Sequence, residues 1–118
     1  MGNSSSTAKI VEMHSLAQWN EKLASTKQSN KLLVIDFSAT WCGPCKWMEP
    51  AIEEYANTYP DVEFIKIDVD TLADVAREYK VEAMPTFVLI KKGKEIARLA
   101  GAKKSELRNL IERHRTSN

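Results

Sequence analysis

Two cysteines separated by two residues are the part of this 118-residue chain best suited to chemistry. Cys42 and Cys45 are its only cysteines, and they stand in the segment Trp41-Cys42-Gly43-Pro44-Cys45-Lys46. A C-x-x-C pair among alternating strands and helices is typical of thiol–disulfide exchange. The pair therefore predicts a small oxidoreductase.

The spacing of the pair restricts where it can sit. On a regular helix, Cβ atoms three residues apart are about 5–6 Å from each other, whereas a disulfide needs about 3.5–4.5 Å. Cys42 is therefore expected at the entrance of a helix, outside regular helical geometry. Pro44 suits a first helical turn, and Gly43 permits an unusual backbone and a close approach by a partner chain.

A helix entrance also predicts unequal roles for the two thiols. Unpaired N–H groups and the positive end of the helix dipole would stabilise a thiolate at Cys42. Cys45 lies a turn deeper and is expected to be the resolving thiol. It would break the mixed disulfide between Cys42 and a substrate and leave an intramolecular Cys42–Cys45 disulfide.

Three other roles compete for the pair. A structural disulfide closing so short a loop would contribute only about 2 kcal/mol, and the cytosol would reduce it. A zinc site needs two further ligands, but His14 and His114 are far apart in the sequence. An unreactive buried pair is the third, because free cysteine is often buried. Redox chemistry is favoured, no metal is expected, and both histidines are interpreted as structural or solvated.

The elements that would position the cysteines follow from apolar patterning. An apolar run over 32–37 predicts a strand covered on both faces, and a long helix should follow from about Cys45 to Tyr59, interrupted and kinked at Pro50. Ser15 and Gln18 form a capping-box pattern. The other expected elements are a strand over 10–13, a helix from 15 to about 30 with Leu16, Trp19 and Leu23 on one face, a strand over 62–69, a helix through 72–79, a hairpin of 86–90 and 96–99 turning at 92–94, and a last helix through 107–111.

The order β-α-β-α-β-α-β-β-α predicts an α/β sheet between helices, with an antiparallel edge at the hairpin.

A length of 118 residues with 43% apolar residues fits one soluble domain. The net charge of +1 gives no field to recruit nucleic acid. No apolar run approaches the roughly 18 residues of a membrane span. Residues 1–8 are interpreted as a flexible tail without a secretory or transit signal, followed by a domain over 9–118, so a cytoplasmic location is expected.

Asp36 is the remaining residue with predicted chemistry. It shares a strand face with Leu32 and Val34, which would bury its carboxylate behind the cysteines. Burial raises the pKa of a carboxyl group, and this would make Asp36 a proton acceptor for Cys45. The alternative is a solvated carboxylate at the end of a strand.

The cysteine segment, preceded by Asp36-Phe37-Ser38-Ala39-Thr40, resembles the active site of thioredoxins. Further family landmarks follow in the right order, namely Met84-Pro85-Thr86-Phe87, Lys92-Gly93 and Gly101-Ala102. The similarity extends over about 10–115, and the tail and residues 37–41 resemble plant h-type members. It implies the thioredoxin fold, a mixed five-stranded sheet with four helices, and a monomeric dithiol reductant of protein disulfides. It also implies recharging by an NADPH-dependent thioredoxin reductase, so that NADPH and FAD belong to the partner and this chain binds no cofactor.

The resemblance gives further residues a role. Lys66 corresponds to a lysine near the buried carboxylate, although alone it would be an ordinary surface lysine. Pro85 implies a cis Met84–Pro85 bond facing the cysteines, against the ordinary trans preference. An extended substrate would pair with the backbone of Met84. Trp41, Gly101 and Ala102 would complete an apolar docking surface, and simple packing is the alternative for Trp41.

Two residues depart from the pattern of many bacterial relatives. Ser38 stands where they carry tryptophan, and Trp47 stands where smaller residues are common, so Trp47 would alter the docking surface and target choice.

Two other functions remain open. A secretory oxidase or isomerase usually carries histidine where this chain has Pro44, and a non-catalytic interaction module would not need both cysteines.

The tail adds one modification pattern. Met1-Gly2-Asn3-Ser4-Ser5-Ser6 matches the M-G-x-x-x-[ST] myristoylation pattern with Gly2 as the acceptor, and some h-type relatives carry comparable tails. A polar tail that matches by accident is the alternative. One myristoyl chain gives an association constant of only about 10⁴ M⁻¹, so any membrane association should be weak and reversible.

Overall fold

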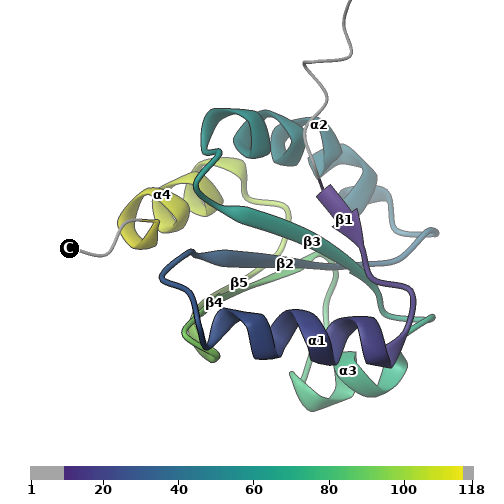
Figure 1. The fold of residues 1–118 in the computed structure, drawn as a ribbon. Helices are drawn as coiled ribbons and strands as arrows, with labels where there is room; N and C mark the ends of the chain where they lie inside the picture. Colours follow the sequence, from purple (N-terminus) through teal and green to yellow (C-terminus); the bar gives the residue numbers. More distant parts are fainter. Residues whose placement is uncertain (1–9, 116–118) are drawn as a thin grey trace, which may run out of the picture.

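The fold is a five-stranded sheet between two pairs of helices. We describe residues 10–115 of a computed structural model (Figure 1). The elements in chain order are β1 (Ile10–Glu12), α1 (Leu16–Thr26), β2 (Leu33–Ser38), α2 (Gly43–Thr58), β3 (Glu63–Asp68), α3 (Ala73–Glu78), β4 (Thr86–Lys91), β5 (Lys94–Ala100) and α4 (Lys104–His114). This order is the predicted one. The predicted tail, including Gly2, lies outside the described residues.

The sheet has the strand order β1-β3-β2-β4-β5. β1, β3 and β2 are parallel, and β4 and β5 add an antiparallel edge. The predicted mixed sheet is therefore confirmed. β2 is central, and all six of its residues are buried, as its unbroken apolar run indicates. Its carboxyl end leads directly to the cysteines.

The helices cover the two faces of the sheet in pairs (Figure 1). On one face, α2 and α4 bury Met48, Tyr55 and Leu107 against strand residues such as Val34 and Phe87. On the other face, α1 and α3 bury side chains against the alternate strand residues, including Trp19, Val75, Ile35, Phe37 and Val88. Because residues alternate between faces along β2, Asp36 lies on the same side as α2.

The first helix begins at the predicted cap but ends earlier than predicted. Ser15 caps it by accepting a hydrogen bond from the Gln18 amide at 3.1 Å, but the Gln18 side chain accepts from the His14 amide at 2.8 Å, one residue before the cap. The helix ends at Thr26 rather than near Asn30. Leu16 is 51% exposed, so it does not share the buried face of Trp19.

Two other elements refine the predictions. α2 continues through Pro50 as one helix, so the predicted interruption is wrong. Pro50 lacks the N–H that would bond to the carbonyl of Lys46, and both residues are exposed on the outer side of the helix. The β4–β5 turn consists of Lys92 and Gly93, with φ of 52° and 80°. Two successive positive φ values form the tight turn that suits a two-residue hairpin.

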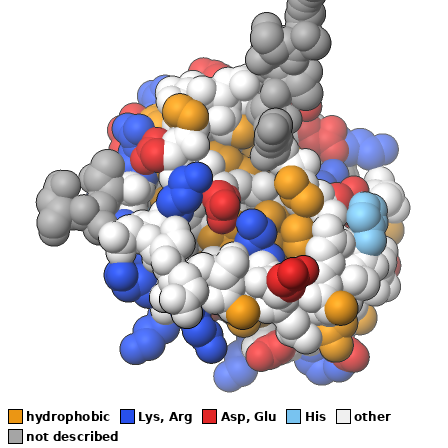
Figure 2. All heavy atoms as spheres, in the orientation of Figure 1, with side chains coloured by type: hydrophobic (Ala, Val, Ile, Leu, Met, Phe, Trp, Pro, Cys, Tyr) orange, Lys and Arg blue, Asp and Glu red, His pale blue; other side chains and the backbone are white. Residues whose placement is uncertain are grey.

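The surface carries charges of both signs. In the face shown in Figure 2, acidic and basic side chains intermingle over much of the surface, and basic ones gather along the lower left edge. No helix within residues 10–115 is long and apolar enough to cross a bilayer.

Candidate active site

Cys42 and Cys45 form a disulfide where β2 gives way to α2, with their Cα atoms 5.3 Å apart. Cys42 is the residue that caps the helix, and its backbone is extended, with φ −94° and ψ 111°. This confirms that the first cysteine lies outside regular helical geometry. Pro44 lies in the first turn of α2, where no helical hydrogen bond is lost.

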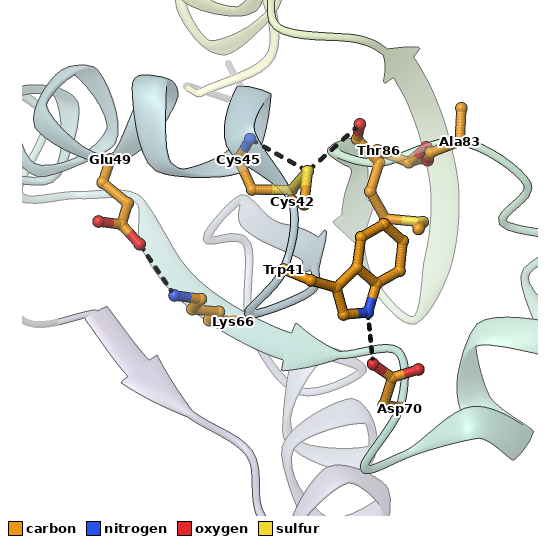
Figure 3. Close-up of a disulfide and its surroundings, with 9 residues drawn as sticks. Trp41, Cys42, Cys45, Glu49, Lys66, Asp70, Ala83 and Thr86 are labelled. Carbon is orange, nitrogen blue, oxygen red and sulfur yellow. Dashed lines mark hydrogen bonds and ion pairs between the residues drawn. A yellow bond between two sulfur atoms is a disulfide. The ribbon is translucent and has the colours of Figure 1, made fainter.

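The sulfur of Cys42 lies in a field that favours negative charge. The Cys45 backbone N–H donates a hydrogen bond to Cys42 Sγ at 3.1 Å, and the amino end of α2 points at the same atom (Figure 3). On reduction, this donor and the helix dipole would stabilise a thiolate at Cys42. The same sulfur lies 3.7 Å from the carbonyl oxygen of Met84.

Burial alone does not separate the two cysteines. Cys42 is 5% exposed and Cys45 is 4% exposed, and both belong to one apolar cluster with Ala39, against which Val69 and Met84 pack. The deeper position expected for Cys45 is therefore not visible as a difference in burial in the disulfide form. The difference between the two sulfurs lies in the helix cap, which involves Cys42.

Asp36 is buried on the α2 side of the sheet, being only 5% exposed. This excludes the alternative of a solvated carboxylate. Burial raises the pKa of Asp36 to about 7; the Lys66 ammonium acts to lower it, and Glu49 acts to raise it further. Its Oδ1 has no hydrogen-bond partner among residues 10–115. A cavity of about 310 Å³ opens beside it, lined partly by Ile52, Glu49 and Lys66.

Lys66 lies next to Asp36 in the ladder between β2 and β3. Its ammonium makes an ion pair with Glu49 at 3.4 Å rather than with Asp36 (Figure 3). Its side chain is 32% exposed. Lys66 therefore combines the two interpretations made from the sequence, since it neighbours the buried carboxylate and reaches the surface.

Of the residues expected to dock a substrate, Met84 lies directly against the cysteines. The Met84–Pro85 bond is cis, as the resemblance implies. The Gly101 N–H donates to the Pro85 carbonyl at 2.8 Å, and Gly101 has a φ of 110°, a conformation that favours glycine. Ala102 is half-buried against the core. Trp41 is 66% exposed, so simple packing does not account for it.

Comparisons with known proteins agree with this geometry. The Thioredoxin family model matches residues 10–113. The chain belongs to the thioredoxin family. It is 52% identical over 114 residues to thioredoxin H2 of Arabidopsis thaliana, covering 97% of this chain and 86% of that protein. It is 56% identical over 105 residues to thioredoxin H2-2 of Oryza sativa subsp. japonica, covering 88% and 78% respectively.

A solved structure shows the same relationship. The crystal structure of thioredoxin NaTrxh from Nicotiana alata matches with a TM-score of 0.92 at 54% identity, covering 98% of this chain and 100% of that one. The relatives bear h-type names, which agrees with the resemblance of the tail and of residues 37–41 to plant h-type members. Thioredoxins reduce protein disulfides by dithiol exchange, and the Cys42–Cys45 pair is the redox-active disulfide of this one.

Some contacts in this thioredoxin's site were not predicted from the sequence. Asp70, just after β3, accepts a hydrogen bond from the Trp41 indole at 2.9 Å and so orients that ring (Figure 3). Ala39 and Val69 form the apolar surroundings of the cysteines. The available signal was their position after strands β2 and β3, whose carboxyl ends meet at one edge of a parallel sheet.

Ser38, which replaces the tryptophan of many bacterial relatives, and His114, which was considered as a zinc ligand, also have defined surroundings. Ser38 is 2% exposed, and its hydroxyl has no partner among the described residues, while its carbonyl accepts from the Val69 amide at 2.9 Å. His114 lies at the end of α4, where burial and nearby Arg113 and Lys91 lower its pKa. Within residues 10–115, no cluster of His, Cys, Asp and Glu is placed to hold a metal ion.

Proposed function

We propose that Cys42 is the attacking thiol and Cys45 the resolving thiol of this thioredoxin, acting as a reductant of protein disulfides. The observation that carries the assignment is the helix cap, in which Cys42 Sγ accepts the Cys45 N–H at 3.1 Å. That donor and the helix dipole favour the thiolate of Cys42, and the thiolate is the nucleophile in disulfide exchange.

The exchange proceeds in two balanced steps. The Cys42 thiolate attacks one sulfur of a target disulfide, so that the target S–S bond breaks, a mixed disulfide forms and one target thiolate leaves. The Cys45 thiolate then attacks Cys42 Sγ, which forms the Cys42–Cys45 disulfide and releases the second target thiolate. Two electrons pass to the target, and its two thiolates take up two protons, one of them derived from Cys45.

Asp36 is the proposed acceptor of the Cys45 proton. It lies on the strand face that α2 covers, and its raised pKa of about 7 lets it take a proton at cellular pH. The adjoining cavity gives a route by which that proton reaches solvent. Lys66 acts through Asp36 by opposing the rise in its pKa, and is therefore a positioning residue rather than a catalytic one.

A target chain is proposed to lie across Met84, Pro85, Gly101 and Ala102, with Trp41 at the edge. Support comes from the Met84 carbonyl 3.7 Å from Cys42 Sγ, because a target backbone paired there would place its sulfur beside the nucleophile. The bond between the Gly101 N–H and the Pro85 carbonyl joins two segments of this surface. Gly43, next to Cys42, has open space where a side chain would stand.

The proposed electron donor is an NADPH-dependent thioredoxin reductase, a flavoprotein. NADPH and FAD are assigned to that partner, and this chain is proposed to act as a monomer with its own disulfide as the redox group. A reductant of protein disulfides works in a reducing compartment, which is why the cytoplasm is proposed. Residues 1–8 are proposed to be a tail separate from the domain.

The reduction potential tests the direction of transfer. Equilibration of the purified protein with glutathione redox buffers should give about −270 mV, a value established for thioredoxins, whereas about −180 mV is typical of disulfide isomerases. A value near the latter would contradict the reductase. Failure to turn over insulin disulfides with excess reductant would instead favour a non-catalytic interaction module.

A further inference from the structure

Two tryptophans flank the active-site disulfide in the sequence, and both are exposed. Trp41 precedes Cys42 and is 66% exposed, and Trp47 follows Cys45 by two residues and is 56% exposed. They are the two largest exposed apolar side chains among residues 10–115. A large exposed aromatic surface is the type of surface that protein interfaces use. The docking surface proposed above accounts for Trp41 and leaves Trp47 without a role.

Trp47 is held in place from a second element. The Lys104 ammonium, in the first turn of α4, lies 3.9 Å from the centre of the Trp47 ring. The backbone of Lys104 is itself fixed to α2, because the Tyr55 hydroxyl donates to its carbonyl at 2.9 Å. An ordered ring loses little further freedom when a partner binds it.

Trp47 and its partner Lys104 are each close in the chain to residues of the proposed docking surface. Lys104 follows Gly101 and Ala102 by only two or three residues. On α2, Trp47 stands one turn after Gly43, and residues four apart share a helix face. Helical side chains lean towards the amino end, so Trp47 leans towards Gly43, where there is no side chain to obstruct a target.

The charge at this position selects a partner chemistry. Lys104 makes no ion pair within residues 10–115, whereas its neighbour Lys103 is 3.9 Å from Glu106. Trp41 has the opposite charge beside it, because its indole N–H donates a hydrogen bond to the carboxylate of Asp70. The edge of the site at Trp47 therefore presents an aromatic face with an unpaired ammonium, and the edge at Trp41 presents an aromatic ring with a carboxylate.

We propose that Trp47 and Lys104 form a second contact for target proteins and select targets that carry an acidic residue beside an apolar one near the disulfide. The target carboxylate pairs with the Lys104 ammonium while its apolar neighbour packs on the Trp47 ring. This inference rests on the proposed function. Charge complementarity of this kind sets the orientation and rate of encounter more than affinity.

A matched set of peptides tests the proposal. Each contains one disulfide and a single Glu, placed at successive positions on either side of the reactive cysteine, and each has a counterpart with Gln at the same position. The pre-reduced protein should reduce the Glu peptide of at least one pair about two- to fivefold faster, the gain typical of an exposed ion pair. The preference should disappear in 0.5–1 M salt, an approximate range in which surface charges are screened.

Variants attribute the preference to the two residues. Trp47→Ala and Lys104→Gln should each lower the ratio of the reduction rates of the Glu and Gln peptides towards one. Lys104→Arg keeps the positive charge and should keep the wild-type ratio. Lys92→Gln is the matched control, because Lys92 is an exposed lysine in the β4–β5 turn, outside the site, and it should leave the ratio unchanged.

The outcomes separate this inference from the function on which it rests. Equal rates for Glu and Gln peptides in every pair, with peptides reduced normally, would overturn the inference alone. So would an undiminished ratio in Trp47→Ala and Lys104→Gln. Failure of the wild-type protein to reduce any of the peptides would overturn the proposed function and, with it, the inference.

Discussion

Asp36 and Lys66 are paired in the ladder between β2 and β3, yet the Lys66 ammonium bonds to Glu49 at 3.4 Å while Asp36 Oδ1 has no hydrogen-bond partner among residues 10–115. The carboxyl group is therefore buried beside a cation without being neutralised by it. Its desolvation outweighs the attraction of Lys66, and its pKa rises to about 7. Two predictions follow from this balance.

The first is that Asp36 makes the folded protein less stable as the pH rises. Its pKa is about 7 when folded and about 3.8 when unfolded, so the folded state binds more protons between these values. The contribution of Asp36 to the unfolding free energy is therefore most favourable below about pH 4 and is lost by about pH 7. The unfolding free energy falls by at most about 4 kcal/mol over this range because of Asp36. The unfolding free energy of Asp36→Asn minus that of wild type should therefore increase from pH 4 to 7. A difference independent of pH would contradict the raised pKa.

Asp36→Asn should also slow the release of the mixed disulfide more than its formation. Only the second step needs Cys45 to lose a proton, and general-base assistance typically contributes 10²- to 10⁴-fold. Stopped-flow measurement of both steps with a protein disulfide provides the comparison. Equal slowing of the two steps would remove Asp36 from the proton transfer.

Asp70→Ala should weaken target docking without changing the dithiol. The bond from the Trp41 indole to Asp70 orients a ring that is 66% exposed, and losing a hydrogen bond worth about 1 kcal/mol would raise KM for insulin up to about fivefold. Asp74→Ala is the control, since Asp74 is an exposed acid that pairs with Arg77 on α3. An unchanged KM in Asp70→Ala would show that the orientation of Trp41 does not matter.

Gly2 remains a predicted myristoylation site, because it lies outside the described residues. Cells expressing the protein and fed an alkynyl myristate should label the wild type and fail to label Gly2→Ala. A single chain anchors weakly, so most of the labelled protein should remain in the supernatant after membranes are pelleted. Label that persists in Gly2→Ala, or no label in the wild type, would support an unmodified tail.

Local patterns in the sequence predicted much of the fold. The apolar run of β2 predicted its burial on both faces, and alternation along the strand predicted that Asp36 would be buried on the face of Leu32 and Val34. The spacing of Cys42 and Cys45 predicted a helix cap, because disulfide geometry excludes the interior of a helix. Each of these properties depends on residues close in the chain.

The remainder depends on contacts between distant residues or on competing local bonds. Trp41 and Asp70 are 29 positions apart, and no local pattern joins them. The end of α1 was predicted too late, because the hydroxyls of Ser25 and Thr26 bond back to carbonyls three residues earlier and help to end the helix. The cis Met84–Pro85 bond came only from the family resemblance, since the intrinsic preference is trans.

The most direct test of the assignment is to find which cysteine holds a trapped target. Cys45→Ser, mixed with oxidised insulin or with a cell extract and analysed by mass spectrometry, should accumulate mixed disulfides at Cys42. Cys42→Ser should form almost none under the same conditions, because Cys45 lacks the helix-cap donor that stabilises a thiolate at Cys42. Mixed disulfides on Cys45 of Cys42→Ser, formed as fast as those on Cys42 of Cys45→Ser, would contradict the assignment of Cys42 as the attacking thiol.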